Sequence, residues 1–561
     1  MENPFDKIAL ALSGGGFRAA AFSLGALKLL HDAELLEKVH MLSTISGGTI
    51  TGAYYAVNAK KKKPFTEIFK SLYDILEKDE IVNTALDVLE NHEVNVPSKR
   101  QNLILSFAET YDRKLFNNEI FGIFWEEEND NYISEKDFHL KEIIFNATDF
   151  DSGIAFRFWK SMGSPRIGNK YNSIKKGQAK SIRMADILAA SSCFPGGFEP
   201  ICIPDDFKWN GENLCESAKK ELKKINVPLM DGGVYDNQGI DSLLQANENN
   251  KKYLLTHPEK PEKTVNRQES TLFLMIDVAG AEKDFFHMPE PKQDTKATDT
   301  LENKYSIIKS KIKKFFRIKS IVVPFSLILM MATIGVLVLG FIRNSLPWPA
   351  VVLLILLVGI FCWVSFFLHK VFRGIDEIKD KYINLVQPEI QKAQEKFPEF
   401  FPEAVEAFGK LSINRIIEMF DVRAKSVFAM TSGIFMKRIR SQGYSGLFKD
   451  ENFEKKRIAS LINDLTKNDP PSTPDFLTSN HLREKALNAA KMPTTLWFKN
   501  NSDKLKDLVA SGRFTLCYNL LIYIHRHYKK SNDVEIEKVK KKLETIWEKI
   551  EHEPYYDIDN I

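Results

Sequence analysis

A serine and an aspartate each stand at the end of a short β-forming run and directly before two glycines. Ser46 follows the run HMLSTI and precedes Gly47–Gly48, and Asp231 follows the run VPLM and precedes Gly232–Gly233. A serine hydroxyl becomes a nucleophile when a neighbouring base takes its proton, and a carboxylate can act as that base. Ser46 and Asp231 are therefore candidates for a catalytic pair.

A glycine-rich segment nearer the N-terminus has the character of an anion-binding turn. The apolar run Ile8–Leu12 leads into three glycines and then into Arg18–Leu30, where apolar residues recur at helical spacing. A helix that begins after a strand and a glycine turn points unpaired N–H groups and the positive end of its dipole at one spot. Glycine also lets a ligand oxygen approach the backbone closely. The three glycines are Gly14, Gly15 and Gly16.

The same glycine turn also fits a dinucleotide-binding fingerprint. Gly14, Gly16 and Ala19 satisfy the pattern GxGxxG/A. A dinucleotide site needs in addition an acidic residue at the end of the second strand, where it holds the ribose. The second β-run of this chain, His40–Ile45, ends in a serine instead. The sequence therefore lacks the acidic residue that a dinucleotide-binding site needs at this position.

The surroundings of Ser46 are typical of a nucleophile elbow, a sharp strand-to-helix turn that exposes a serine hydroxyl. The usual pattern is GxSxG, whereas here Thr44 occupies the position of the first glycine. An isolated Ser-Gly-Gly is more often a structural turn, but a preceding glycine anion hole favours the catalytic interpretation. The histidines are scattered, and none lies in a recognisable strand-end motif after Ser46. Asp231 is therefore the preferred candidate for the base.

Three motifs in this order resemble those of the patatin-like phospholipases, which are serine lipid acylhydrolases with a Ser–Asp dyad. The motifs are GGGFR, TISGG and MDGG, and the resemblance covers most of residues 7–280. Three further segments resemble the family's sequence between and after the motifs, namely residues 143–158, 189–201 and 272–280. The ordered set is far more specific than any single motif.

The resemblance implies an α/β hydrolase fold with a mainly parallel central sheet between helices. It assigns Ser46 as the nucleophile, Asp231 as the base, and the turn Gly14–Gly16 as the oxyanion loop with Arg18 beside it. It implies hydrolysis of acyl esters, above all of phospholipids, through an acyl-serine intermediate without metal or cofactor. A free aspartate has a pKa of about 3.9 and is a poor base, so burial must raise the pKa or the proton must move in concert with attack. Arg18 could either contribute charge or hold the loop.

Composition excludes several other classes of protein. The 561 residues include 78 Lys+Arg against 74 Asp+Glu, a net charge of +4, and 44% hydrophobic residues. This is the composition of a folded protein, and it argues against a bulk nucleic-acid binder, which needs a pervasive basic face. The five cysteines show no CxxC spacing, so neither a disulfide framework nor a zinc ribbon is indicated. The sequence does not indicate an oligomeric state.

Two charge-free apolar runs predict a transmembrane hairpin at residues 321–342 and 350–368. As helices they would be roughly 33 and 28 Å long, which matches the hydrocarbon core of a bilayer at about 30 Å. Basic residues flank the pair, and only Arg343–Pro349 separates the two runs. The positive-inside rule then predicts an integral membrane protein, in a bacterial inner membrane, with the catalytic domain and both termini cytoplasmic.

The chain is thus expected to have three parts. Residues 1–300 form the catalytic domain, residues 301–375 a basic stretch and the hairpin, and residues 376–561 a helical region packed on the catalytic domain. Within the second part, residues 305–319 interleave basic and apolar side chains. They are either a simple continuation of the helix out of the membrane or an interfacial stretch that grips anionic headgroups.

Two other functions remain open at this level. The first is a membrane-tethered scaffold or sensor with an auxiliary hydrolase fold, against which the presence of both Ser46 and Asp231 counts. The second is an esterase or thioesterase of the same fold that acts on soluble substrates. The preferred prediction is a membrane-anchored lipid acyl hydrolase with membrane phospholipids as substrate.

Overall fold

The protein is described from a computed structural model of the full chain. The description covers residues 3–78, 80–162, 164–209, 225–257, 268–279, 331–336, 338–339, 370, 421–427, 429–467, 473–496, 498, 502–529 and 531–558. Residues 1–285 and 428–561 belong to one compact unit, and residues 286–427 belong to a second. The account below concerns the first unit.

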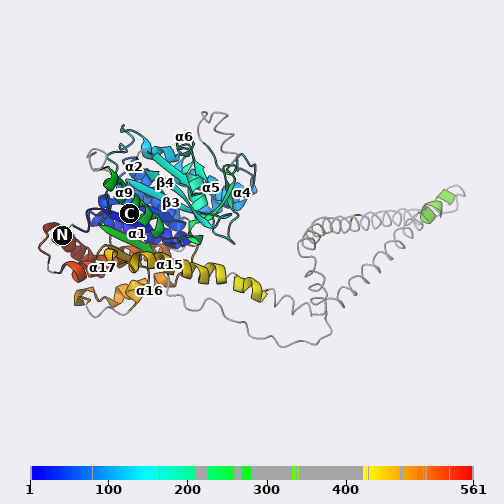
Figure 1. Ribbon diagram of the computed structural model, residues 1–561. Helices are drawn as coiled ribbons and strands as arrows, with labels where there is room; N and C mark the ends of the chain where they lie inside the picture. The colour runs from blue at the N-terminus through cyan, green and yellow to red at the C-terminus, as the bar shows by residue number, and fades with distance from the viewer. Residues whose placement is uncertain are drawn as a thin grey trace, which may run out of the picture. The chain divides into compact units, whose positions relative to one another are not determined.

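A sheet of ten strands, counted over the described residues, forms the centre of this unit (Figure 1). Its spine is a run of neighbouring parallel strands in the order β10-β9-β1-β2-β3. Every residue of β1, β2, β3 and β9 is buried, as expected for parallel strands that are covered on both faces. These strands are β10 (Arg457–Leu461), β9 (Leu272–Asp277), β1 (Ile8–Leu12), β2 (Val39–Ile45) and β3 (Glu142–Asp149).

The other half of the sheet is antiparallel, so the sheet is mixed rather than mainly parallel. Short connections after β3 leave no room for a crossover helix, and they therefore pair β3 with β4 and β4 with β5 in opposite directions. β8 returns antiparallel on β3 and brings its last residue, Asp231, opposite Ala147. The strands of this half are β4 (Ile154–Ser161), β5 (Ser164–Gly168), β6 (Ser173–Ile174), β7 (Ile201–Ile203) and β8 (Val227–Asp231).

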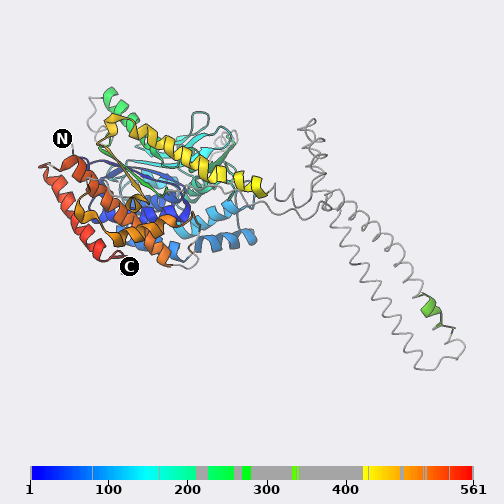
Figure 2. The same cartoon turned by 90° about the horizontal axis from the view of Figure 1, so that it is seen from below.

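Helices cover both faces of the sheet. The larger hydrophobic core includes side chains of α1 (Gly16–Asp32), α2 (Gly47–Lys60) and α7 (Met184–Ser192). The smaller core, on the opposite side of the strands, includes side chains of α9 (Ile240–Thr256) and Leu447 of α15 (Met436–Phe448). Figure 2 shows α15 in yellow beside the strands. Among the described residues, the remaining helices with at least nine residues are α3 (Phe65–Glu77), α4 (Glu80–Glu90), α5 (Leu103–Tyr111), α16 (Asn480–Lys491), α17 (Ser502–Tyr528) and α18 (Val534–His552).

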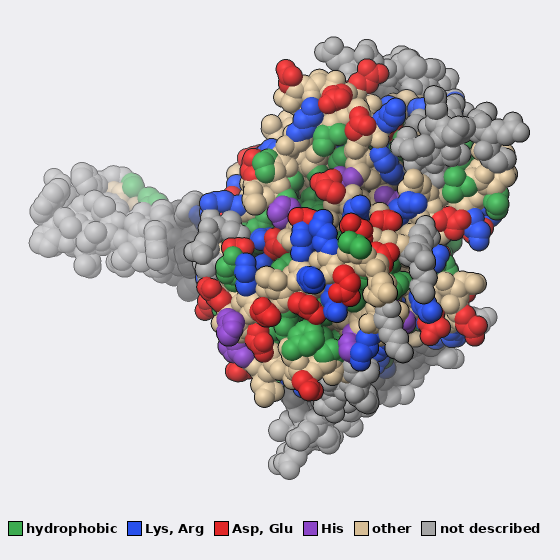
Figure 3. All heavy atoms as spheres, turned by 90° about the vertical axis from the view of Figure 1, so that its left-hand side faces the viewer, with side chains coloured by type: hydrophobic (Ala, Val, Ile, Leu, Met, Phe, Trp, Pro, Cys, Tyr) green, Lys and Arg blue, Asp and Glu red, His purple; other side chains and the backbone are tan. Residues whose placement is uncertain are grey.

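The C-terminal region is built into the same unit as the N-terminal strands. Strand β10 pairs in parallel with β9, and α17 packs against α1. The two helices approach closely because glycines meet backbone at the crossing: a Cβ on Gly25 would lie 1.8 Å from the Val509 oxygen, and one on Gly512 would lie 2.0 Å from the Phe22 oxygen. The surface carries interspersed acidic and basic side chains on the face shown in Figure 3, in keeping with the small net charge.

The structure contradicts the predicted transmembrane hairpin. Among the described residues, the structure has no helix with both the length and the apolar character needed to cross a bilayer, which contradicts the predicted integral, two-span protein with cytoplasmic termini. The predicted span 350–368 lies outside the described residues, and of the span 321–342 only residues 331–336 and 338–339 are described. A membrane span needs an unbroken helix of about 20 apolar residues. An apolar, charge-free sequence does not by itself establish such a helix. The fold class is α/β, with a central sheet and a helical C-terminal region.

Candidate active site

Ser46 occupies a strained turn between β2 and α2. The strand ends at Ile45, the helix begins at Gly47, and Ser46 itself has φ 49° and ψ −119°. A side chain at positive φ is energetically unfavourable, and such strain persists only where the surrounding structure enforces it. Here the enforcement is steric, because a Cβ on Gly47 would lie 1.9 Å from the Gly16 oxygen and one on Gly48 would lie 2.4 Å from the Leu12 oxygen. The two glycines therefore let α2 start directly against the glycine turn.

Asp231 ends β8 beside Ser46. Ser46 is close enough to its carboxylate to act on the carboxylate pKa, and the carboxylate accepts the backbone N–H of Gly233 at 2.7 Å. The backbone of Asp231 is also fixed, because its N–H donates to the Cys193 carbonyl at 3.1 Å and its carbonyl accepts the Thr148 hydroxyl at 2.9 Å. The structure thus brings together the serine and the aspartate that the sequence singled out.

Burial controls the acidity of Asp231. The residue is only 2% exposed, and burial raises its pKa to about 6, while the hydrogen bonds from Ser46 and from the Gly233 N–H act in the opposite direction. A carboxylate with this pKa is mostly ionised at neutral pH, yet it takes up a proton far more readily than an exposed aspartate. Asp231 therefore has the properties of a general base for the hydroxyl it contacts.

The glycine turn lies against Ser46 and, among the described residues, has N–H groups without a backbone acceptor. A Cβ on Gly14 would lie 3.4 Å from the Ser46 Cβ. The Gly14 N–H donates to the Asn237 carbonyl at 3.0 Å, whereas the N–H groups of Gly15 and Gly16 have no backbone acceptor in the described part of the chain. Gly15 has φ 147° and Gly16 has φ 63°, so both positions require glycine. These two N–H groups stand at the start of α1, where an oxyanion would be stabilised.

Arg18 points away from the reacting groups. Its guanidinium donates to the Met492 carbonyl at 2.5 Å and to the Val278 carbonyl at 3.0 Å, and the side chain is 2% exposed. Next to it, the Phe17 N–H donates to the Thr495 carbonyl at 2.8 Å. Of the two roles open to Arg18 in the sequence, the geometry corresponds to holding the loop. The partners that it holds come from the end of β9 and from the C-terminal region.

A chain of buried hydroxyl groups contacts the backbone of the turn at Ser46. The sequence motifs did not assign these hydroxyl groups a role. The Ser46 N–H donates to the Ser191 hydroxyl at 3.1 Å, and that hydroxyl donates to the Asn146 carbonyl at 2.7 Å. Thr49 lies 2.8 Å from the same hydroxyl. Ser191 and Asn146 belong to the segments 189–201 and 143–158, so the resemblance of those segments was the signal that could have identified them.

A second group of residues that the motifs missed connects α15 to the glycine turn. The Arg440 guanidinium donates to Asn237 Oδ1 from Nε at 2.8 Å and from Nη2 at 3.1 Å. The other end of the Asn237 amide stands 2.6 Å from the positions that a Cβ would occupy on Gly14 and on Gly233. Asn237 therefore lies between the oxyanion loop and the turn after Asp231. Its closeness to the MDGG motif is a signal in the sequence, whereas nothing in the sequence pointed to Arg440.

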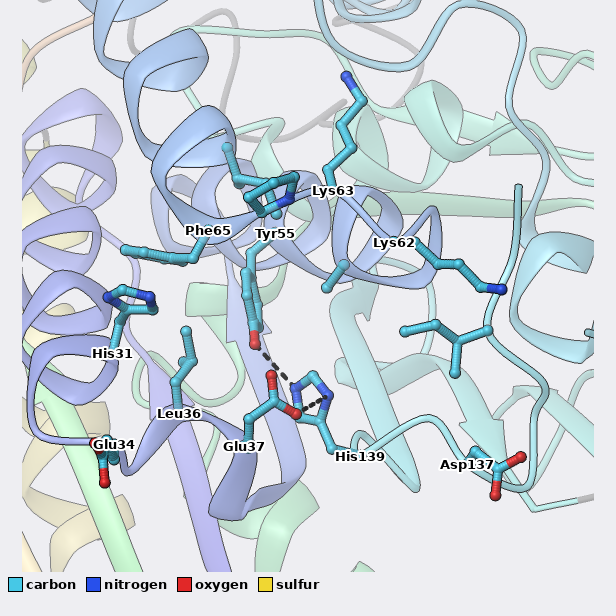
Figure 4. Close-up of a pocket in the computed structure, with 14 residues that line it drawn as sticks. His31, Glu34, Leu36, Glu37, Tyr55, Lys62, Lys63, Phe65, Asp137 and His139 are labelled. Atoms are coloured by element: carbon cyan, nitrogen blue, oxygen red, sulfur yellow. Dashed lines mark hydrogen bonds and ion pairs between the residues drawn. The ribbon is translucent and has the colours of Figure 1, made fainter. Parts of the chain in front are cut away.

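A cavity of about 520 Å³ lies at the opposite end of α2 from Ser46 (Figure 4). In it, Tyr55 Oη lies 2.9 Å from His139 Nε2, and Glu37 Oε2 lies 3.4 Å from His139 Nδ1. Burial lowers the pKa of His139 to about 3, so the imidazole is neutral and Tyr55 donates to it while it donates to Glu37. This histidine is engaged within the cavity and lies away from the serine. Asp231 is therefore the base that the geometry offers to Ser46.

The described residues include no group of three or more His, Cys, Asp or Glu side chains arranged to hold a metal ion. The site itself combines a serine hydroxyl, a buried carboxylate and two backbone N–H groups, which are the kinds of group that acyl transfer through a covalent intermediate uses.

The family model for the patatin-like phospholipases matches residues 10–244, which include the glycine turn, Ser46 and Asp231. The matched structures include the crystal structure of VipD from Legionella pneumophila, with 12% sequence identity and a TM-score of 0.23 over 97% of this chain and 90% of that chain. No curated protein matches the chain.

Proposed function

Because residues 10–244 form a patatin-like phospholipase domain, whose family consists of serine hydrolases, we propose that this enzyme cleaves acyl esters of phospholipids on a dyad of Ser46 and Asp231. The observation that carries the proposal is the position of Ser46 beside a buried carboxylate whose pKa is raised to about 6. No histidine among the described residues contacts Ser46 by a hydrogen bond that would compete with this assignment.

Acylation follows from the positions of these groups. The Ser46 oxygen attacks the ester carbonyl carbon as its proton passes to the Asp231 carboxylate, and the carbonyl oxygen becomes an oxyanion. The N–H groups of Gly15 and Gly16 donate to that oxyanion, and one such donor is typically worth about 3–4 kcal/mol in the transition state. When the tetrahedral intermediate collapses, protonated Asp231 gives its proton to the leaving alkoxide. The products of this half-reaction are a lysolipid and acyl-Ser46.

Deacylation repeats the same steps with water. Asp231 takes a proton from a water molecule as the water oxygen attacks the acyl-Ser46 carbonyl. The second tetrahedral intermediate releases the fatty acid, and the proton returns to the Ser46 oxygen. The raised pKa of Asp231 serves both half-reactions, since the carboxyl group must first accept a proton and then donate it.

The proposal is tested by comparing hydrolysis of a diacyl phospholipid in mixed micelles with hydrolysis of a soluble short-chain ester. Ser46→Ala and Asp231→Asn should each reduce both activities by at least 10³-fold, and the double variant should be little worse than either single one, because the two residues act as a unit. A wild-type enzyme that hydrolyses only the soluble ester would favour the esterase alternative. A folded Asp231→Asn variant with near-normal turnover would remove the aspartate from the mechanism.

A further inference from the structure

The segment that covers the turn after Asp231 is a helix with two different faces. It begins as the π-helical turn Met430–Phe435 and continues as α15. On its inner face, the Met436 methyl carbon lies 3.1 Å from the position that a Cβ on Gly233 would occupy, and Arg440 holds Asn237. This face therefore contacts the catalytic turn itself.

The outer face of the same helix is apolar and basic. Met430, Ile434 and Phe435 are 41%, 49% and 47% exposed. Lys437 and Arg438 follow them and are also exposed. Two residues along a helix correspond to a rotation of about 200°, so Ile434 and Arg438 point away from the side on which Met436 lies. The large apolar groups therefore face outward, where a helix of a globular protein normally carries polar residues.

This combination is what an interfacial helix requires. Apolar side chains enter the boundary between headgroups and acyl chains, and neighbouring cations attract anionic headgroups. Exposed apolar side chains that stand singly need no explanation, but here three lie within six residues, and two cations follow after Met436. The positive charge beside the apolar group selects an anionic lipid surface over a neutral one.

We propose that residues 430–438 are the surface with which this enzyme docks on an anionic lipid aggregate. The inference rests on the proposed function, because a phospholipid must reach Ser46 from such an aggregate. Docking through the outer face would place the turn after Asp231, which the inner face contacts, next to the lipid. It would also bring the aggregate close to Arg440 and hence to Asn237 and the glycine turn.

Binding to vesicles tests the docking surface without any need for hydrolysis. The probes are 100 nm vesicles of dioleoylphosphatidylglycerol and dioleoylphosphatidylcholine at 3:7, and vesicles of the latter lipid alone. Co-sedimentation should show at least tenfold weaker binding of I434Q/F435Q to the anionic vesicles. K437Q/R438Q should lose a similar factor on the anionic vesicles and change little on the neutral ones. F476Q, at a residue that is 49% exposed elsewhere in the chain, is the matched control and should bind like wild type.

Two additional measurements separate docking from folding and from the proposed chemistry. Hydrolysis of soluble 4-nitrophenyl butyrate should stay within twofold of wild type in both double variants, which shows that they are folded. Ser46→Ala should bind vesicles like wild type, so a failure of the proposed hydrolysis would leave the docking result intact. F435W should be quenched by brominated lipid in the anionic vesicles, and F476W should not.

Three results would contradict the proposed docking surface. Wild-type vesicle affinity of I434Q/F435Q, or absence of quenching in F435W, would overturn the proposal. If the variants instead converted a wild-type dimer into a monomer without a change in vesicle binding, the outer face would be a contact between two copies of the chain.

Discussion

Asp231 and Ser46 lie side by side, although they stand at the ends of two different strands, β8 and β2, that do not pair with each other. Both strands pair with β3: β2 runs parallel to it and ends with Ile45 opposite Asn146, and β8 runs antiparallel to it and ends with Asp231 opposite Ala147, so the two strand ends meet at neighbouring residues of β3. The contact therefore depends on β8 running in the opposite direction to β2 along the same neighbour, β3. A wholly parallel sheet would not bring the end of β8 to Ser46 by this route.

Activity should depend on pH through Asp231. The base must be ionised to accept the serine proton, and its pKa is raised to about 6. The kcat/KM for a soluble ester should therefore fall about tenfold per pH unit below pH 6 and level off above it. The measurement is a pH series of initial rates. A profile that is flat down to pH 4.5 would contradict the raised pKa.

The raised pKa of Asp231 should also lower the free energy of unfolding at neutral pH. A carboxyl group whose folded pKa exceeds its unfolded value binds its proton more tightly in the folded state, so stability falls as pH rises from about 4 through 6. From a shift of about two pKa units, the loss is on the order of 3 kcal/mol at neutral pH. Asp231→Asn should therefore unfold at a higher denaturant concentration than wild type at pH 7.5 and lose that advantage at pH 4. Equal midpoints at pH 7.5 would be inconsistent with a buried, ionised carboxylate.

Arg440 should act as a positioning residue through Asn237. Without its guanidinium the Asn237 amide is no longer held between Gly14 and Gly233, and the oxyanion loop loses a support. Arg440→Ala should lower kcat for a soluble ester roughly tenfold with little change in KM, because the defect lies in transition-state stabilisation. Arg438→Ala, two residues earlier on the exposed face, is the matched control and should leave kcat unchanged. A similar loss in both variants would indicate only a general effect on α15.

Ser191 should be needed for the strained elbow. Ser191→Ala leaves the Ser46 N–H and the Asn146 carbonyl without their buried partner, which should cost about 1–3 kcal/mol of unfolding free energy and lower kcat as well. Ser106→Ala is the control, since that buried hydroxyl donates to the Asn102 carbonyl at the start of its own helix. Denaturant unfolding together with ester hydrolysis distinguishes the two. Equal stability of both variants would show that the hydroxyl chain does not support Ser46.

The contact between α1 and α17 should stabilise the catalytic unit. Gly512→Ala would place a methyl group 2.0 Å from the Phe22 oxygen and force the two helices apart. We expect a loss of at least about 2 kcal/mol, as for other overpacked cores. Gly177→Ala, where a Cβ would meet nothing within 4 Å, should change stability by less than about 1 kcal/mol. If Gly512→Ala were as stable as wild type, the C-terminal helix would not be essential to the unit.

Local sequence patterns predicted the parts of the site that depend on local structure. The resemblance to the patatin-like phospholipases, which are serine hydrolases, is confirmed for residues 10–244, where the family model matches. The strand ends at Ser46 and Asp231 could be read from apolar runs that stop at glycines. The antiparallel half of the sheet could not be predicted from the sequence, because the direction of a strand depends on the length and path of the segment that connects it to the previous strand. The addition of β10 to the sheet and the contact of Arg440 with Asn237 join residues distant in sequence, for which one sequence carries no pairing signal.

The central claim, that Asp231 activates Ser46 as a nucleophile, is tested most directly by the rate at which a fluorophosphonate labels the enzyme. The account predicts that mass spectrometry finds the adduct on the peptide that contains Ser46. It also predicts that Asp231→Asn slows the labelling at pH 7.5 by at least 10³-fold while the variant remains folded. Labelling of another residue, or labelling of Ser46 in Asp231→Asn at the wild-type rate, would contradict it.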